Sequence, residues 1–312
     1  MSQRLPRFSV QVGQQFASWD DIVRIFREAE ALGYDAAYTY DHFMAVMMDP
    51  YEPCLEAWTS LAALAALTRR IRLGVLVTGN TYRHPAVLAK MATTVDVVSG
   101  GRLDLGIGAG WFEPEHRALG IPFRTAGARC DMLDEALAVI RALWTEREAS
   151  FAGRYYQLDR AIAEPKPAQR PHPPILVAAT GERKMLRIVA RHADIWNGFG
   201  SPEVARRKIG VLAEHCRAVG RDVDAIEKSL LLPAHIGDDP GAWEPLIQGY
   251  AAYQGISTEE APRWMLLGSP ADVRRQVEDF LAAGVTHFIL TLTPFNFDVM
   301  PRFAAEVMPA FR

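Results

Sequence analysis

Short apolar runs alternate with segments of helical periodicity along almost the whole chain. Three of these runs are Phe8–Val12, Ile71–Val77 and Leu103–Gly108, and their Val, Ile and Leu content is typical of strands buried on both faces. A helical segment follows the first run, beginning after Ser18, a residue type that favours helix starts, and ending at Gly33. The pattern predicts about eight strands, each followed by a helix or by a loop and a helix.

The other elements continue this alternation to the end of the sequence. Further strands are predicted over Asp35–Tyr40, Ile175–Ala179, Asp194–Trp196, Ile226–Leu232 and Thr286–Leu292. Further helices are predicted over Leu55–Leu67, Pro85–Val98, Ala128–Trp144, Glu182–His192, Pro202–Val219, Gly241–Ala261, the segment from Ser269 to Gly284, and Phe295–Ala310. Eight such units in a chain of this length are typical of a single (β/α)8 TIM barrel, an α/β fold. A doubly wound sheet with a second domain is the alternative, and the lack of a low-complexity linker favours one domain over residues 1–312.

One stretch, Glu148–Pro174, departs from the alternation. It contains five prolines, at positions 165, 167, 171, 173 and 174, so it cannot form a continuous helix. We interpret it as an insertion between the fourth and fifth strands, made of a short hairpin and then an extended segment.

The composition is that of an ordinary globular enzyme and excludes several classes of protein. Apolar residues make up 49% of the 312 residues and the formal charge is −3, which argues against disorder and against a mainly electrostatic nucleic-acid partner. The longest apolar stretches are too short to cross a bilayer, and no signal-peptide core follows the polar Met1–Arg7. Cys54, Cys130 and Cys216 are far apart and form no CxxC pair, which is typical of a reducing compartment. We therefore expect a cytoplasmic protein without nucleic-acid or membrane partners.

In a TIM barrel the active site lies at the carboxyl ends of the strands, and polar or small residues gather at these ends of the predicted strands. Asp41 and His42 follow the second strand. His42 is the best candidate for proton transfer, because an imidazole titrates near working pH and Asp41 beside it can influence its charge. The alternative is that Asp41 caps the next segment and His42 only packs against its neighbours.

A glycine-rich turn follows the fourth strand. The spacing Gly106-x-Gly108-x-Gly110 differs from that of a dinucleotide-binding loop, in which the third glycine comes three residues after the second and a helix begins at once. We expect these glycines to let a flat ring approach the backbone, with Trp111 lining the pocket. A glycine-rich turn with Trp111 in the core is the alternative.

A second candidate loop, Thr180-Gly181, joins the fifth strand to a helix that begins Glu182-Arg183-Lys184. Free N–H groups at a helix start, together with two cations, favour the binding of a phosphate, and an ordinary helix cap is the alternative. The histidines and carboxylates do not form a metal-ligand set, and no Gly-x-Ser-x-Gly elbow occurs. Neither a metal site nor a serine nucleophile is therefore expected.

Four motifs, taken together and in this order, resemble those of the luciferase-like (LLM class) oxidoreductases. They are Tyr40-Asp41-His42-Phe43, Asn80-Thr81-Tyr82-Arg83-His84-Pro85, Gly106-Ile107-Gly108-Ala109-Gly110-Trp111 with Glu115-His116, and Thr180-Gly181-Glu182-Arg183-Lys184. Within this family the chain is most similar to the branch that uses coenzyme F420, a deazaflavin. The resemblance covers nearly the full chain and implies a TIM-barrel oxidoreductase that transfers a hydride between the deazaflavin and an organic substrate.

The resemblance also implies roles for individual residues. The catalytic positions are His42, Asp41 and Trp111, with His42 near the reacting edge of the ring. The third strand would carry a bulge with a non-prolyl cis peptide at Val75-Leu76. The expected cofactor contacts are Asp41, Val75, Leu76, Thr78, Ala109, Gly110, His116, Ala179, Thr180, Gly181 and Arg183, with Thr180, Gly181 and Arg183 around the phosphate. The Glu148–Pro174 insertion would partly cover the barrel mouth.

Two departures from the family pattern bear on the substrate. The phosphate loop has Ala178-Ala179 or Ala179-Thr180 where two glycines are frequent, and Trp111 replaces a glutamate of the sugar-phosphate dehydrogenases, which argues against sugar-phosphate oxidation. An apolar, adaptable pocket for a small organic molecule is expected instead, lined by Trp111, Phe43, Met44, Met47 and Met48.

The alternatives are an FMN-dependent monooxygenase of the same family, which uses reduced flavin and oxygen, and a cofactor-binding carrier or sensor with little catalysis. The two enzymatic readings share their motifs, so the sequence separates them poorly. Exposed apolar helices such as Leu55–Leu67 favour a homodimer.

Overall fold

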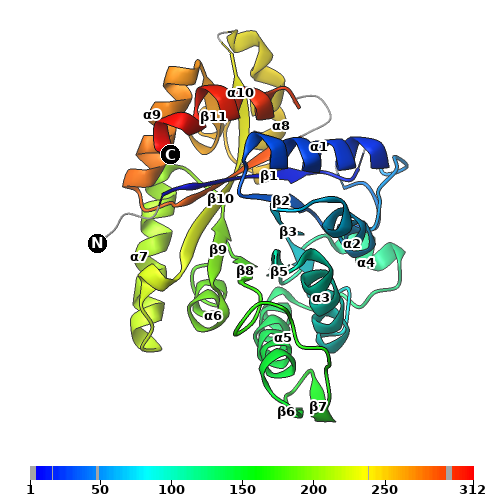
Figure 1. The fold of residues 1–312 in the computed structure, drawn as a ribbon. Coiled ribbons are helices and arrows are strands. Elements are labelled where there is room, and N and C mark those ends of the chain that lie inside the picture. The colour runs from blue at the N-terminus through cyan, green and yellow to red at the C-terminus, as the bar shows by residue number, and fades with distance from the viewer. Residues whose placement is uncertain (1–4, 16, 47–48, 238, 293–296) are drawn as a thin grey trace.

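The computed structural model describes residues 5–15, 17–46, 49–237, 239–292 and 297–312 of the chain. Within these residues it forms a closed barrel of eight parallel strands surrounded by helices (Figure 1). The barrel strands are β1 (Arg7–Val12), β2 (Ala36–Thr39), β3 (Arg72–Val75) continued by β4 (Thr78–Gly79), β5 (Leu103–Gly108), β8 (Ile175–Ala178), β9 (Ile195–Gly198), β10 (Glu227–Ile236) and β12 (His287–Leu292). The predicted TIM barrel is therefore confirmed.

The first and last strands close the barrel. Val10 of β1 lies opposite Leu290 of β12 on one side and opposite Ala37 of β2 on the other. β12 in turn pairs with β10, and β10 pairs with β9. Because all these pairs are parallel, each connection must cross back outside the sheet, and the helices make these crossings.

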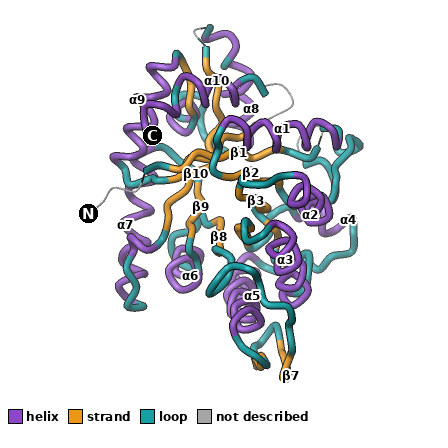
Figure 2. The backbone as a smooth tube through the Cα atoms, viewed as in Figure 1, coloured by secondary structure: helices purple, strands orange, loops and turns teal. Residues whose placement is uncertain are grey.

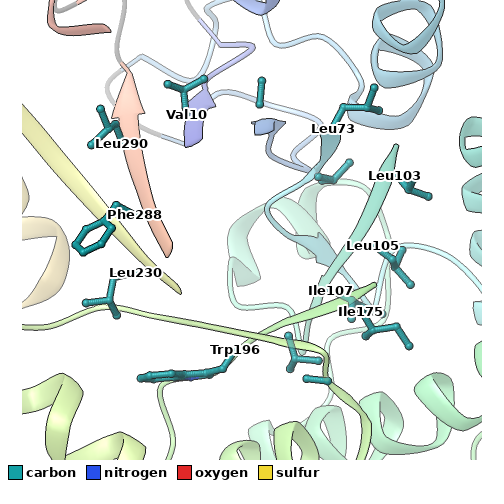
Figure 3. Close-up of a cluster of buried hydrophobic side chains, with 14 of the residues drawn as sticks. Val10, Leu73, Leu103, Leu105, Ile107, Ile175, Trp196, Leu230, Phe288 and Leu290 are labelled. Carbon is teal, nitrogen blue, oxygen red and sulfur yellow. The ribbon is translucent and has the colours of Figure 1, made fainter. Parts of the chain in front are cut away.

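Two apolar layers stabilise the barrel. The larger layer lies between the strands and the helices and includes Val10, Leu105 and Phe288 (Figure 3). The smaller layer lies inside the barrel and contains Ala36, Tyr38, Leu76, Leu176, Ile195 and Ile289. Successive residues of a strand thus pack into different layers, as Ala36 and Ala37 do. Burial of both faces explains why the strands are nearly continuous apolar runs in the sequence.

The helices follow the predicted segments and form an outer ring (Figure 2). They are α1 (Trp19–Leu32), α2 (Ala57–Leu67), α3 (Pro85–Ser99), α5 (Ala126–Thr145), α6 (Met185–His192), α7 (Pro202–Ala218), α9 (Pro270–Ala282) and α10 (Val299–Glu306). The Ser18 hydroxyl starts α1 by accepting a hydrogen bond from the Asp21 amide at 3.1 Å, and Gly33 ends it with a φ of 82°. No helix in the described part of the chain is long and apolar enough to span a membrane.

Several boundaries differ from the prediction. A short helix, α4 (Glu113–Ala118), follows β5, and a short strand, β11 (Leu266–Gly268), pairs with the end of β10, which runs on beyond Leu232. The segment predicted as one helix over Gly241–Ala261 contains the shorter α8 (Glu244–Gln254), because Gly255 in the left-handed conformation ends it. The predicted start of the last helix, Phe295, lies outside the described residues.

The Glu148–Pro174 insertion contains a hairpin of β6 (Ala149–Ala152) and β7 (Gln157–Ala161), which pair antiparallel. The Glu135 carboxylate of α5 accepts hydrogen bonds from the backbone amides at the hairpin tip, residues 154–156, at 2.8–3.2 Å. The tip is thereby fixed against α5, and the chain then returns to β8 without regular secondary structure.

Candidate active site

His42 lies in the loop after β2, at the carboxyl ends of the strands, and is 8% exposed. Its Nδ1 lies 3.1 Å from Oε2 of Glu115, a residue of α4 that is 73 positions away in the chain. The carboxylate that pairs with His42 is therefore Glu115 and not the adjacent Asp41. Glu115 belongs to one of the family motifs, but nothing in the sequence indicates its role.

Glu115 is fully buried, and both of its carboxylate oxygens accept hydrogen bonds. Its Oε1 accepts hydrogen bonds from the amides of Phe43 at 2.6 Å and Met44 at 3.1 Å, and the Tyr82 hydroxyl donates to its Oε2. Burial acts to raise the pKa of Glu115, but the hydrogen bonds from His42, Tyr82 and the Phe43 amide outweigh burial and lower this pKa below its usual value. Because an ionised carboxylate can only accept, His42 Nδ1 carries a proton, and Nε2 is the nitrogen that can exchange a proton with a ligand.

Aromatic rings surround the His42 imidazole. The ring centres of Tyr40, Trp111 and Phe112 lie 5.8, 5.9 and 5.9 Å from it, each in an edge-on arrangement. Trp111 is 53% exposed and also contacts Tyr253 of α8 at 6.0 Å. Trp111 thus lies at the surface beside His42, and a helix from the second half of the chain completes this aromatic wall.

The other residues expected to line an apolar pocket are only partly described. Phe43 is half-buried, packs edge-on against Tyr82 at 5.0 Å and lies 5.5 Å below the Arg83 guanidinium. Met47 and Met48 lie outside the described residues. The apolar character of the site therefore depends on the aromatic wall among the residues that can be placed.

Asp41 takes part in a separate buried network. The Arg83 guanidinium binds both carboxylate oxygens of Asp41, at 2.5 and 3.1 Å, and the Thr78 hydroxyl donates to Oδ2 at 2.7 Å. Trp58 Nε1 donates to Thr78 Oγ1 at 2.6 Å, and Arg83 also binds Glu56. Burial raises the pKa of Asp41, and the hydrogen bonds from Arg83 and Thr78 oppose this only in part. Asp41 and Thr78, both expected at the cofactor, bind each other and fix the loop after β2.

The third barrel strand is interrupted between β3 and β4. A non-prolyl cis peptide lies there, between Leu76 and Val77, one bond later than the expected position at Val75-Leu76. The regular strand β3 ends at Val75, which still pairs with Thr39 of β2, so it stops two residues before the predicted end at Val77. The Leu76 carbonyl then accepts a hydrogen bond from Gln11 Nε2 at 2.6 Å.

Two glycines of the turn after β5 make room for this interruption. A Cβ added at Gly106 would overlap the Val75 carbonyl oxygen, and one added at Gly108 would lie 3.0 Å from Val77 Cγ2. At these two glycines the third strand fills the space that a side chain would occupy, so the glycines allow the strand to approach. Gly110 differs, since its φ of 79° lies in the left-handed region that favours glycine.

Three of the expected cofactor contacts belong to the barrel wall. Val75, Leu76 and Ala179 are all buried. The Ala179 amide donates to the Asn197 carbonyl at 2.9 Å, and its carbonyl accepts a hydrogen bond from Trp196 Nε1 at 3.0 Å. Both backbone groups of Ala179 are thus used within the barrel, and neither is free for a phosphate.

His116 is also buried, and both of its ring nitrogens are bonded within the protein. Nδ1 lies 2.8 Å from the Phe112 carbonyl oxygen and Nε2 lies 2.7 Å from Thr81 Oγ1. The Tyr82 ring stacks on the imidazole at 4.8 Å. His116 therefore links the residues after β5 to Thr81 and has no free ring nitrogen.

Two buried polar atoms at the strand ends have no hydrogen-bond partner among the described residues. They are Thr39 Oγ1 and Asn80 Oδ1. A buried polar group left unpaired costs roughly 1–3 kcal/mol, so these atoms are available to a ligand. The Asn80 backbone binds the end of β5, next to the half-buried Ala109 and Gly110. These polar residues cannot be selected as ligands from the sequence, because their lack of partners is visible only in the folded chain.

The loop between β8 and α6 is open to an anion. Thr180, Gly181 and Arg183 are exposed, and Lys184 at the start of α6 makes no side-chain capping bond to the helix. The Lys184 ammonium instead binds Asp131 of α5 at 2.8 Å. Both predicted cations are exposed, but Lys184 is paired with Asp131, whereas Arg183 has no acidic partner among the described residues.

Comparison with known proteins places this site in a family. Residues 4–287 match the family model described as luciferase-like monooxygenase. An uncharacterized protein of Mycobacterium tuberculosis is 38% identical over 174 residues, which are 56% of this chain and 60% of that protein, so the match spans less than two thirds of that protein. The F420-dependent glucose-6-phosphate dehydrogenase of Kineococcus radiotolerans is 30% identical over 311 residues, covering 88% of this chain and 90% of that enzyme.

A solved structure shares the fold. An F420-dependent secondary alcohol dehydrogenase in complex with an F420-acetone adduct superposes with a TM-score of 0.88 at 20% identity, covering 99% of this chain and 100% of that chain. The family model spans most of the sequence, and the Kineococcus relative is similar over nearly its full length. The chain therefore belongs to the luciferase-like monooxygenase family.

Proposed function

We propose that the protein is an oxidoreductase that transfers a hydride between coenzyme F420 and a small, apolar organic substrate. The observation that carries this proposal is the His42–Glu115 pair, because a buried imidazole held by a carboxylate at the barrel mouth can exchange a proton with a ligand. A relative named for F420 dependence matches nearly the full chain, which favours the deazaflavin over FMN.

The residues at the strand ends fit a ring cofactor with a phosphate. The backbone of Ala109 and Gly110, with the unpaired oxygen of Asn80, would hold the ring. The exposed Thr180-Gly181 turn and Arg183, at the uncapped start of α6, would hold the phosphate. When bound, the deazaflavin supplies the chemistry of hydride transfer.

His42 would move a proton at the substrate oxygen. In the oxidation of an alcohol, Nε2 accepts the hydroxyl proton, and in the reverse direction the imidazolium returns a proton to the carbonyl oxygen. Glu115 fixes the ring through Nδ1 and stabilises the positive charge of the imidazolium. Trp111 and Tyr253 form an apolar wall on the exposed side, which favours an apolar substrate.

The cofactor assignment is tested by titrating the purified protein separately with F420 and with FMN. We expect F420 to bind at micromolar concentration and FMN to bind far more weakly. Binding of FMN alone would refute the assignment. The second candidate function is that of an FMN-dependent monooxygenase, which the description of the matching family favours. A yellow purified protein that oxidises an organic substrate with oxygen would support this second function.

We further propose that the enzyme is a cytoplasmic homodimer. Its three cysteines are free thiols, as is usual in a reducing compartment. Leu67 of α2 and Val97 and Val98 of α3 are exposed apolar side chains near a hollow that lies between these helices. Light scattering should give twice the chain mass of 34.7 kDa, and a monomer would contradict the dimer.

A further inference from the structure

A second hollow lies on the surface of the barrel and has a volume of about 520 Å³. It is lined by Phe123, Arg124, Thr125, Ala128, Arg154 and Tyr155. These residues come from the start of α5, with the residues before it, and from the tip of the β6–β7 hairpin. Because Glu135 of α5 binds three backbone amides of the tip, the two sides of the hollow are fixed relative to each other.

Two guanidinium groups in this hollow have no acidic partner within the described part of the chain. The central carbons of Arg124 and Arg154 lie 5.9 and 5.3 Å from the centre of the Tyr155 ring. The acids of the neighbouring turns of α5 are already bound: Glu135 accepts from three amides, and Asp131 pairs with a lysine at 2.8 Å. The hollow thus presents two cations around one aromatic ring, an arrangement that suits carboxylates.

Two side chains connect the hollow to the proposed cofactor site. Arg129 stacks on Phe123 at 3.9 Å and donates to the Gly110 carbonyl at 3.2 Å. Lys184, at the end of the phosphate loop, lies with its Nζ 3.4 Å from the Gly127 carbonyl oxygen, next to the lining of the hollow. The hollow therefore adjoins both the turn proposed to hold the ring and the loop proposed to hold the phosphate.

We propose that the hollow binds the carboxylates of the cofactor tail beyond its phosphate, an inference that rests on the proposed function. FMN ends at its phosphate, whereas the tail of F420 continues into a chain of glutamates. Arg124 and Arg154 pair with these carboxylates, and the Tyr155 ring contacts their methylene groups. The hollow thereby selects the deazaflavin by its tail, and this contribution falls as salt screens the charges.

The test measures dissociation constants by the fluorescence of the cofactor itself, for F420 with several glutamates and for the form without any glutamate. The variant is the double change Arg124→Gln and Arg154→Gln. The matched control is Arg27→Gln with Arg217→Gln, two exposed arginines outside both hollows. Thermal melting of both variants verifies that they are folded.

At low salt we expect the hollow variant to bind glutamylated F420 about tenfold more weakly, since exposed ion pairs contribute modestly. Binding of the form without glutamate stays unchanged, as does all binding by the control. Equal affinity of the folded hollow variant and the unchanged protein for glutamylated F420 would overturn this inference and leave the proposed function standing. Failure of the unchanged protein to bind either form would overturn both.

Discussion

Glu115 accepts a hydrogen bond from His42, with its Oε2 3.1 Å from Nδ1. It also accepts hydrogen bonds from two backbone amides and from the Tyr82 hydroxyl. The change Glu115→Gln removes the negative charge and leaves one acceptor oxygen where two are in use. We expect kcat to fall about 100-fold, because the imidazole loses both its orientation and the charge that stabilises its protonated form. Affinity for F420, measured by fluorescence, should change little, because Glu115 is fully buried and is not among the proposed cofactor contacts.

A control on the same helix separates this effect from a general loss of structure. Glu113 is 54% exposed and pairs with Arg117 at 3.0 Å, so Glu113→Gln should leave kcat unchanged. In a His42→Ala background, Glu115→Gln should lower kcat little further, because Glu115 acts through the imidazole that this variant lacks. Independent, multiplicative losses in the double variant would show that Glu115 does not act through His42.

The partner of His42 illustrates what the sequence can show at the scale of a residue. Asp41 is adjacent in the chain and was the expected partner, but neighbouring side chains of an extended segment point to opposite sides. Asp41 accordingly binds Arg83, and the pairing partner comes from a residue 73 positions away on α4. His42 and Trp111 could be selected because they follow strand ends, whereas a contact between distant segments has no local signal.

At the scale of elements, the interrupted third strand depends on the absence of a side chain at Gly106. A Cβ there would overlap the Val75 carbonyl oxygen, so Gly106→Ala must displace the strand. We expect it to lower the free energy of unfolding by roughly 1–3 kcal/mol and to reduce F420 affinity. Urea denaturation gives the first quantity and fluorescence titration the second.

Gly210, in the middle of α7, is the matched control. A Cβ added there meets no atom within 4 Å, so Gly210→Ala should stabilise the helix by up to about 1 kcal/mol. If both changes to alanine had the same effect on unfolding, the space at Gly106 would not be the cause.

The elements that the sequence predicted share one physical property. Strands buried on both faces and long amphipathic helices leave a clear apolar pattern, and these elements match the barrel. The six-residue α4 and the three-residue β11 are too short to show a period, and both were missed. α4 carries Glu115, so the missed element is also the reason that half of the proposed catalytic pair was not identified.

Across the whole molecule, the barrel closes where β12 lies between β1 and β10. Glu227 at the start of β10 binds Arg7 of β1 at 3.0 Å, and its Oε1 lies 2.5 Å from Nδ1 of His287 in β12. Burial acts to raise the pKa of Glu227, but His287 and Arg7 outweigh it and lower the pKa to about 2. Three strands from the two ends of the sequence thus meet at one ionised carboxylate.

Acid should therefore weaken the closed barrel. Because the folded protein lowers the pKa of Glu227, its stabilisation is complete above the usual value of 4.5 and is lost as the pH falls through about 2. Glu227→Gln lacks this contribution. Its free energy of unfolding should therefore fall less between these two pH values than that of the unchanged protein, and the difference should be at most roughly 3 kcal/mol. Glu278→Gln, an exposed change on α9, should behave as the unchanged protein does. Urea denaturation at successive pH values measures all three, and parallel curves for Glu227→Gln and the unchanged protein would show that the barrel seam is not the acid-sensitive point.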